Sequence, residues 1–193
     1  LNDTFLDCVS LSSVVIPDTV EKINMQAFRN CSSLIAVQMP LALTDIFYGA
    51  FYGCKNLQYI DLPENIKYIG VFAFAECVSL QTIELPRAVV DVAAKVFYNC
   101  TNLTEVNLSK FTTSIGVQSF YGCANLKELK LPNTVEKIDL AAFENSGLAE
   151  LHCRALTPPV VNRSFGYKGK VVVPYRSLEL YRQAEVWKDC ILE

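Results

Sequence analysis

The cysteines are the residues of this chain best suited to carry chemistry, because a thiol can bind a metal, form a disulfide or attack a substrate. Six of them recur every 23 residues: Cys8, Cys31, Cys54, Cys77, Cys100 and Cys123. Zinc sites need ligand pairs about two to four residues apart, which this spacing does not supply. Stacked equivalents would stand about 4.8 Å apart with parallel side chains, whereas a disulfide needs Cβ atoms about 3.8 Å apart that converge. The spacing favours free, buried thiols that pack as small apolar groups.

An isolated disulfide is the alternative, and Cys153 with Cys190, which lie outside the series, is the best candidate pair. His152 is the only histidine, and it could serve as a base only for a nucleophile within hydrogen-bond reach. Cys153 follows it directly, but consecutive residues of a strand point to opposite faces. The segment GYKGK at 166–170 lacks the GxxxxGK[ST] spacing of a phosphate loop. We therefore expect no enzymatic activity, no metal and no cofactor.

Composition narrows the class of protein further. The chain has 193 residues, of which 51% are hydrophobic and 19% charged, with a formal net charge of −3. These values are typical of a globular protein, and no apolar run approaches the roughly 20 residues of a membrane helix. Nucleic acid is not expected as a partner, because no patch of Lys and Arg is evident. The opening residues LNDTFLDC do not resemble a signal peptide, so we expect any targeting signal to lie upstream or to have been removed.

An internal repeat accounts for most of the chain. Seven phenylalanines lie 23 residues apart: Phe5, Phe28, Phe51, Phe74, Phe97, Phe120 and Phe143. Around them the unit reads A-F-x-x-C-x-x-L-x-x-I-x-L-P-x-x-V-x-x-I, where I stands for any aliphatic residue. Such a period predicts a solenoid in which each unit forms one coil and equal side chains stack into interior rows. We expect L-x-x-I-x-L to form a short strand of a parallel sheet, and the opposite side to be extended or a brief turn.

The turns of the unit are also predictable. Two residues after each repeat phenylalanine stand Asp7, Asn30, Gly53, Glu76, Asn99, Gly122 and Asn145. Gly, Asn and Asp tolerate a left-handed backbone, so we expect a positive φ angle at this corner, with Glu76 as the strained exception. Pro closes most units and marks the end of the strand, because it cannot donate to a ladder.

The pattern AFxxCxxLxxIxLPxxVxxI resembles the BspA-like class of bacterial leucine-rich repeats over residues 5–153. The tail, 152–193, resembles the closing segment of that family, with a TPP turn, a VVVP strand and a Tyr- and Trp-bearing helix. The resemblance implies a secreted or cell-surface protein of host-associated bacteria, used in adhesion or ligand binding and without enzyme activity. The chain departs from the pattern at Ser109, which replaces the proline, at Phe47 and Ala93, which replace a glycine, and at Ser146, where the last repeat loses its cysteine and one residue.

The fold expected from these features is an α/β-class leucine-rich-repeat solenoid that is mostly β. Its parallel sheet would lie on a concave face, with extended or turn segments on the convex side and a capping strand and helix at the C-terminus. We place the solenoid at 1–153, with six full units and partial ends, and the cap, continuous with it, at 154–193. Because Leu1 falls within a repeat, we expect the chain to be a fragment or to follow a removed segment.

The cap can be predicted in some detail, because the last coil of a solenoid must be covered. Residues 171–173 would add a strand that Pro174 ends, and Ser177 would be the N-cap of a helix over 178–189. Three side chains of that helix would cover the exposed core: Leu178, Tyr181 and Trp187.

The outward positions of the predicted sheet are the candidate ligand face: Tyr59, Asp61, Thr82, Glu84, Glu105, Asn107, Glu128, Lys130, Glu150 and His152. Its five carboxylates face a single lysine, and like charges on neighbouring strands repel, so packing alone does not select them. Simple solvation of an open sheet remains the alternative explanation. A second outward row, Tyr52, Tyr98 and Tyr121, could contact sugars or protein, or cover the seam between coils.

The leading functional hypothesis is a binding module outside the cell, whose curved face contacts a protein or glycan partner. The alternative is a structural spacer that displays another domain and has no ligand of its own. An enzyme is the weakest hypothesis, and a monomer is favoured over an oligomer.

Overall fold

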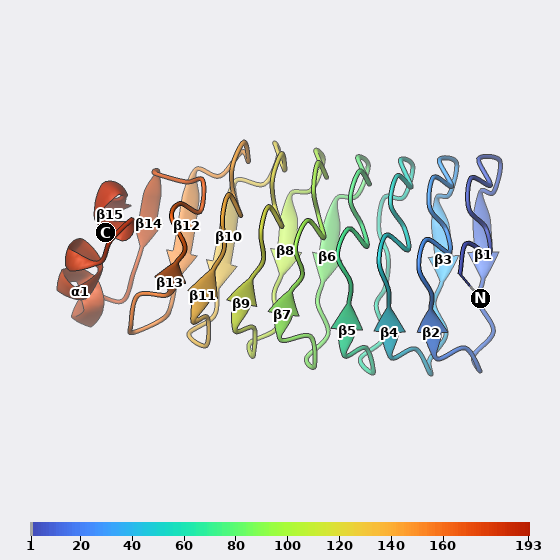
Figure 1. The fold of residues 1–193 in the computed structure, drawn as a ribbon, viewed down its shortest axis with the longest axis horizontal. Helices are drawn as coiled ribbons and strands as arrows, with labels where there is room; N and C mark the ends of the chain where they lie inside the picture. The colour runs from blue at the N-terminus through green and yellow to red at the C-terminus, as the bar shows by residue number, and fades with distance from the viewer. Residues whose placement is uncertain (1) are drawn as a thin grey trace.

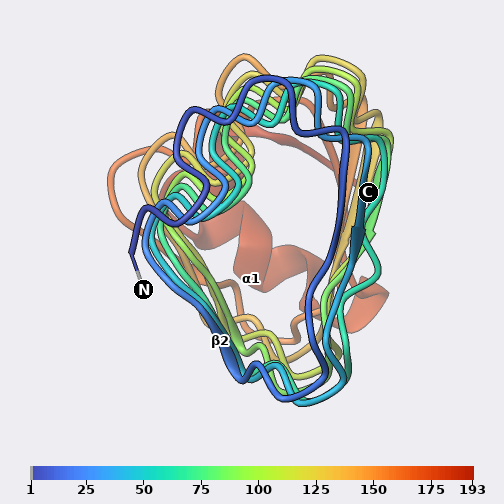
Figure 2. The ribbon, with the colours of Figure 1, turned by 90° about the vertical axis from the view of Figure 1, so that its right-hand side faces the viewer.

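The 23-residue units wind as coils stacked along one axis, in a computed structural model that describes residues 2–193 (Figure 1). Seen along this axis, the coils superpose into a closed outline (Figure 2). Buried apolar side chains of all the coils form one core inside it. Helix α1 (Leu178–Gln183) lies across the C-terminal end of the stack. The predicted leucine-rich-repeat solenoid is therefore confirmed.

Strands run in two rows along the stack, and all their pairings are parallel. The first row, formed by L-x-x-I-x-L, contains β1 (Ser13–Val15), β3 (Ala36–Gln38), β6 (Thr82–Glu84), β8 (Glu105–Asn107), β10 (Glu128–Leu131) and β12 (Glu150–Cys153). The second row, around V-x-x-I, contains β2 (Lys22–Ile23), β4 (Asp45–Ile46), β5 (Tyr68–Ile69), β7 (Asp91–Val92), β9 (Ser114–Ile115), β11 (Lys137–Ile138) and β13 (Val160–Val161). The brief extended segments expected on this second side are thus confirmed.

Register follows the repeat. Ile83 of β6 pairs with Val106 of β8, one full unit later. Leu129 of β10 pairs with Leu151 of β12, which is one residue short of a unit because the last repeat has lost a residue.

The sequence predicted one continuous sheet for the first row, but the row is divided into three sheets. No strand forms over residues 58–62, and β8 does not pair with β10. Leu57 and Ile60 are nevertheless buried, with 0% and 5% of their surface exposed. Each strand has only two to four residues, so a small divergence between neighbouring coils removes its few ladder hydrogen bonds. Interior packing then holds the coil in place.

The repeat phenylalanines form a stack through the interior. Ring centroids of successive phenylalanines from Phe5 to Phe143 lie 5.1–6.1 Å apart, with near-parallel planes. The row ends at Phe165, whose ring meets Phe143 edge to face at 5.9 Å. Offset stacking at these distances is a favoured arrangement of aromatic rings.

Five of the six repeat cysteines, from Cys31 to Cys123, are buried beside the phenylalanines with free thiols, whereas Cys8, in the first coil, is exposed, so the burial predicted for it is wrong. Each sulfur donates to the carbonyl oxygen of the phenylalanine 26 residues earlier; for Cys77 and Phe51 the distance is 3.1 Å. The same contact is made by Cys31, Cys54, Cys100 and Cys123. The prediction of a packing role is confirmed for these five cysteines, but the sequence did not reveal that each thiol also satisfies a backbone carbonyl.

Turn geometry matches the predicted corner. All seven residues two places after the repeat phenylalanine have positive φ, from 55° at Asn99 to 72° at Gly53 and Gly122. Glu76 has the same left-handed backbone, with φ 59°, although its residue type does not favour it. Its carboxylate accepts a hydrogen bond from the Asn99 amide. A second left-handed corner, two residues before each phenylalanine, was not predicted. It is occupied by Asp3, Gln26, Gly49, Phe72, Lys95, Gln118 and Ala141.

The C-terminal segment differs from its prediction in three ways. The strand, β14 (Lys170–Val172), begins and ends one residue early, and a further strand, β15 (Ile191–Leu192), pairs with it. The helix over 178–189 is instead a 3-10 turn, η1 (Tyr175–Ser177), followed by α1 and a second turn, η2 (Trp187–Asp189). Helix α1 stops because Ala184 is extended and Val186 has φ 73°.

Ser177 does stand immediately before α1, but its side chain makes no capping hydrogen bond. It is buried, with 3% of its surface exposed, and its backbone is already in the helical region because η1 runs directly into α1. The capping role predicted for the Ser177 hydroxyl is therefore wrong.

Aromatic side chains close the end of the core, as expected. Trp187 donates its indole N–H to the Pro159 carbonyl at 2.9 Å, and its ring lies 4.9 Å from that of Phe165. Tyr181 is fully buried and donates to the Ala155 carbonyl at 2.9 Å, while Leu178 packs partly buried against the core.

The disulfide considered for Cys153 and Cys190 does not form, and both thiols are free. The Cys153 sulfur contacts the Tyr181 hydroxyl at 3.2 Å, whereas the Cys190 sulfur faces the Tyr167 carbonyl. Within residues 2–193, no helix combines the length and apolar character required to cross a membrane.

Candidate functional site

The candidate ligand face lies on the outer side of the first strand row, and we call it the strand face. In each strand the middle residue points inward: Ile83, Val106 and Leu129 are all nearly buried. The residues on either side point outward, which follows from the alternation of side chains along a strand. All ten candidates lie on this face; eight are exposed, and Glu150 and His152 are half-buried.

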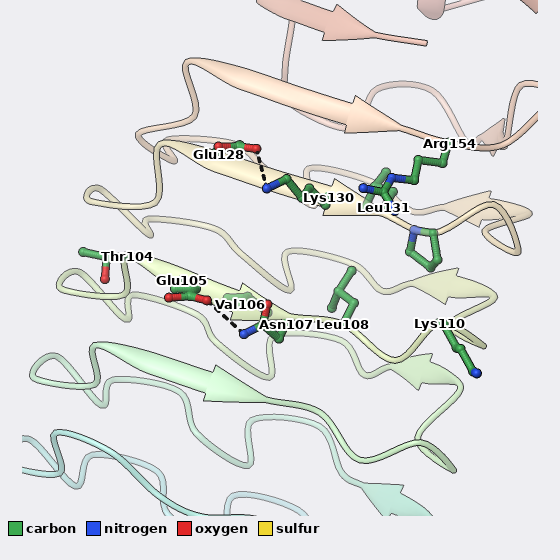
Figure 3. A pocket seen from close by; sticks show the side chains of 11 residues that line it. Thr104, Glu105, Val106, Asn107, Leu108, Lys110, Glu128, Lys130, Leu131 and Arg154 are labelled. Atoms are coloured by element: carbon green, nitrogen blue, oxygen red, sulfur yellow. Dashed lines mark hydrogen bonds and ion pairs between the residues drawn. The ribbon is translucent and has the colours of Figure 1, made fainter. Parts of the chain in front are cut away.

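The strand face is hollowed at its centre (Figure 3). One hollow, of about 500 Å³, spans β8 and β10 with the residues beside them, and reaches Arg154 at the end of β12. Its lining consists of Thr104, Glu105, Val106, Asn107, Leu108, Lys110, Glu128, Lys130, Leu131, Pro132 and Arg154. We call it the central hollow.

A second hollow, of about 380 Å³, adjoins it toward the N-terminus, and we call it the acidic hollow. It is lined by Tyr59, Ile60, Asp61, Leu62, Glu64, Thr82, Ile83, Glu84, Pro86, Glu105 and Asn107. Glu105 and Asn107 line both hollows, so the two form one connected depression. Six of the ten candidates line the acidic hollow, which also gains Glu64, a residue just beyond the strand position.

The charges of the acidic hollow have no basic partner. Within residues 2–193, none of Asp61, Glu64, Glu84 and Glu105 makes an ion pair. Glu105 accepts only a hydrogen bond, from the Asn107 amide at 3.0 Å, which is drawn in Figure 3. Carboxylates on neighbouring coils repel one another, and together they give this part of the face a negative electrostatic potential.

The C-terminal part of the strand face is neutralised instead. Glu128 Oε1 lies 3.0 Å from Lys130 Nζ and 3.3 Å from His152 Nε2, which is itself 2.9 Å from Glu150 Oε1. The hydrogen bond from Lys130 lowers the pKa of Glu128 below its ordinary value. Lys170 extends this network to Glu150 and to Glu193, and the hydrogen bond with Glu193 raises the pKa of Lys170.

Two cations at the edge of the central hollow lack a carboxylate partner among the described residues: Lys110 and Arg154. Figure 3 shows the Arg154 side chain extending along Leu131 toward Lys130. Together Lys110, Lys130 and Arg154 form what we call the basic rim. Lys110 and Arg154 were missed in the sequence because they follow the ends of their strands, whereas only positions inside the strands were considered.

One departure from the repeat could have pointed to this rim. Ser109, which replaces the usual proline, is buried; its hydroxyl donates to the Arg87 carbonyl at 2.8 Å and accepts from the Phe111 amide at 3.2 Å. Two cations lie close to the ring of Phe111 in this turn, with Arg87 4.8 Å and Lys110 5.2 Å from its centroid. Both contacts lie within the range of cation–π attraction.

The tyrosine row lies away from the strand face and is half-buried. The rings of Tyr98 and Tyr121 stack at 4.9 Å, and the Asn145 amide donates to the Tyr121 hydroxyl at 2.7 Å. Arg29 lies 4.6 Å from the ring centroid of Tyr52. These contacts join neighbouring coils, which favours the seam-covering interpretation of this row.

The histidine and the cysteine thiols, which could take part in catalysis, are separated from one another. His152 contacts carboxylates on the strand face, while the next residue, Cys153, is buried on the opposite side against Tyr181, as strand alternation predicts. Burial raises the pKa of Cys153 and of every thiol from Cys31 to Cys123, which keeps these groups protonated. Across residues 2–193, no three His, Cys, Asp or Glu side chains are grouped to hold a metal. These groups therefore do not form a catalytic set, and the strand face is the candidate site for binding a partner.

The rows of stacked coils define a leucine-rich-repeat solenoid, a fold commonly used for protein binding and generally without catalytic activity. The model of the BspA type leucine rich repeat region matches six copies of the unit, over residues 2–92 and 44–169. The chain therefore belongs to the BspA-type leucine-rich-repeat family, as its sequence pattern indicated.

Solved structures agree with this assignment. A leucine-rich repeat protein from T. pallidum is 32% identical, with a TM-score of 0.72, over 75% of this chain and 68% of its own. A leucine rich cell surface protein from Faecalibacterium prausnitzii is 25% identical, with a TM-score of 0.76, over 92% of this chain and 59% of its own. A leucine-rich repeat protein from Bacteroides ovatus, 24% identical over 90% of this chain and 58% of its own, has the same fold, with a TM-score of 0.72.

The chain thus spans less than three fifths of the length of the last two proteins. The comparison with curated proteins finds no match.

Proposed function

We propose that the chain is a non-enzymatic binding module, secreted or held at the cell surface, whose strand face contacts a protein or glycan partner. The similarity to a leucine rich cell surface protein supports the location, and the family supports binding over catalysis. In this proposal the solenoid of 1–153 presents the face, and 154–193 closes its end.

The observation that carries the proposal is the connected depression on the strand face. Its two hollows, of about 500 and 380 Å³, lie on stacked coils whose interior is fully packed, so the depression exists before any partner arrives. A preformed surface of this kind loses little conformational freedom on binding. Its unpaired carboxylates are groups that a partner of opposite charge would satisfy.

Charge reversal across the face is the direct test. The variant with Asp61, Glu84, Glu105 and Glu128 changed to Lys is compared with the natural chain on arrays of glycans and of proteins. We expect loss of binding to the ligands that the natural chain captures. A control matched in charge, with Glu21, Glu136, Glu144 and Glu185 changed to Lys, alters exposed carboxylates that line neither hollow and make no ion pair with another described residue.

If a captured ligand binds the four-residue variant and the natural chain equally, the strand face is not the binding surface. Equal melting temperatures of natural chain, variant and control would show that the fold has survived each set of changes.

A structural spacer remains the second candidate, since the chain corresponds to less than three fifths of two similar proteins. A spacer would capture no ligand on either array. It would also tolerate the four reversals in the full-length protein without loss of function.

A further inference from the structure

We infer that the strand face selects a polypeptide segment of mixed charge, with its basic side chains in the acidic hollow and an acidic side chain at the basic rim. This inference rests on the proposed function and names the partner of the same face. It uses the separation of charge along the stack, which neither the repeat nor the fold requires.

The acidic half is set by four carboxylates on consecutive coils, none of which has a basic partner within residues 2–193: Asp61, Glu64, Glu84 and Glu105. Tyr59, 60% exposed, stands at the N-terminal side of this half. A lysine or arginine side chain can lay its apolar stem on a tyrosine ring while its charged end reaches a carboxylate. The acidic hollow therefore suits basic side chains.

The basic half is set by the central hollow. Arg154 and Lys110 have no carboxylate partner in the described chain, whereas Lys130 already contacts Glu128. Leu108, Leu131 and Pro132 line the same hollow and supply an apolar floor beside the cations. A carboxylate on a short side chain can pair with Arg154 while its own stem covers that floor.

The two halves together favour protein over an acidic glycan. A polyanionic sugar chain long enough to reach the basic rim would also cross the acidic hollow, where like charges repel it. A neutral glycan would leave the unpaired charges of both halves unsatisfied. A peptide can carry both signs within a few residues, and it alone satisfies both halves at once.

The spacing of the coils sets the length of the recognised segment. Glu84 ends β6 and Arg154 follows β12, three strand positions further along the row. Paired strands lie about 4.8 Å apart, and the step from β8 to β10 is not hydrogen-bonded, so these positions lie at least about 14 Å apart, which an extended chain spans in about four residues at about 3.3 Å each. The expected segment has a basic group and an acidic group with their centres about four residues apart.

Labelled peptides test the inference directly by fluorescence anisotropy. The probes are Lys-Lys-Lys-Gly-Glu-Glu-Glu, the single-sign peptides Lys-Lys-Lys-Gly-Ser-Ser-Ser and Ser-Ser-Ser-Gly-Glu-Glu-Glu, and a heparin fragment. We expect the mixed peptide to bind at least about fivefold more tightly than either single-sign peptide, since each exposed charge pair contributes a modest, additive amount. The preference should shrink between about 0.01 M and 0.15 M salt, as the Debye length falls from about 30 to about 8 Å.

Paired variants separate the two halves. Glu84→Gln with Glu105→Gln should weaken the mixed and the lysine peptides by about fivefold and leave the glutamate peptide unchanged. Lys110→Gln with Arg154→Gln should weaken the mixed and the glutamate peptides and leave the lysine peptide unchanged. The controls matched in charge are Glu136→Gln with Glu185→Gln for the acidic pair and Arg176→Gln with Lys188→Gln for the basic pair, all exposed and outside either hollow.

Three results would overturn the inference: no binding of the mixed peptide at low salt, tighter binding of heparin than of the mixed peptide, or equal effects of both variant pairs on all peptides. These outcomes differ from failure of the proposed function. If the arrays yield a ligand lost on charge reversal while the peptides show no preference, the face binds but does not select mixed charge.

Discussion

The repeat array and the C-terminal segment enclose the same core by different means. In the array, each contact recurs one coil later: phenylalanine rings stack at 5.1–6.1 Å, and each buried cysteine donates to a phenylalanine carbonyl. In the C-terminal segment every contact occurs once. Trp187 reaches Pro159, and Tyr181 reaches Ala155 and Cys153.

The difference shows how a repetitive fold ends. Within the array a side chain finds an identical neighbour on each side, so the same residue type suits every coil. At the end one neighbour is missing, and a larger, amphipathic side chain must both cover the core and satisfy polar atoms left by the last coil. Substitutions in the two regions should therefore differ in how much they lower the free energy of unfolding and in how many coils they affect.

The largest effect is expected from Trp187→Ala. The change removes a buried ring that contacts Phe165 and Tyr181 and leaves the Pro159 carbonyl without its donor. We expect a loss of about 4 kcal/mol in the free energy of unfolding, measured by urea denaturation. Hydrogen exchange should accelerate mainly in β14, α1 and β15; uniform acceleration over the whole array would contradict the distinct character of this end.

Phe74→Ala should have the next largest effect, about 3 kcal/mol, because Phe74 is fully buried between Phe51 and Phe97. Leu80→Ala, on the next interior row, should cost about 2 to 3 kcal/mol. The loss should extend to coils on both sides, because each coil is held by its neighbours. A melting temperature close to that of the natural chain would show that these rows are not the stabilising core.

High pH should weaken the array through its thiols. Burial raises the pKa of Cys31 to about 11 and that of Cys123 to about 12, from an unperturbed value of 9.0. Below pH 9 the thiols are protonated in both states, but as the pH rises from 9 toward 11 the unfolded chain loses protons that the folded chain retains. The free energy of unfolding should therefore fall over this range.

Urea denaturation at pH 7, 9 and 10 would measure this slope. Cys77→Ala with Cys100→Ala should reduce it, whereas Cys8→Ala, at an exposed position, should leave it unchanged. An unchanged slope in the double variant would mean that the buried thiols do not control the alkaline stability.

The smallest effect is expected at the left-handed corners. Gly49 has φ +57°, and an added Cβ would meet its nearest atoms at 3.8 Å, an ordinary contact. Gly49→Ala should therefore cost only the backbone penalty, about 1 kcal/mol. Ala141→Gly, at the equivalent corner with φ 56°, should give a gain of similar size, lowered by the loss of a buried methyl group. Thermal melting of both variants checks the pair, and equal signs would contradict it.

Periodicity carried most of the fold. The interior rows, the strands of the first row, the extended segments opposite them and the corner at Asn30 and Gly53 followed from residue types that recur at one spacing, whereas the pairing of those extended segments into a second row of strands was not predicted. The second corner was missed because Gln26, Phe72 and Lys95 have no shared preference for a left-handed backbone. The closed path of the coil imposes the left-handed backbone at this corner, so the residue types there do not predict it.

The rest could not be read from the unit. Residues 58–62 match the repeat fully, so nothing in them signals the missing strand pairing, which depends on divergence between whole coils. The end of helix α1 before Val186 was also hidden, because a β-branched residue at φ 73° is locally unfavourable and is held there by packing. In the candidate site, positions inside the strands were found, but Lys110 and Arg154 were not.

The stacking of similar coils spaces the charges of the strand face along one axis, with only small differences between neighbouring coils. The acidic hollow and the basic rim are separated by a whole number of coils, and the packing of the interior does not depend on that number. Duplication or loss of a single 23-residue unit between Glu84 and Lys110 would change that separation by one step, roughly 4.8 Å, while the interior contacts shared by all units would form again. Such a surface can be retuned to partners of different charge spacing without redesign of its core.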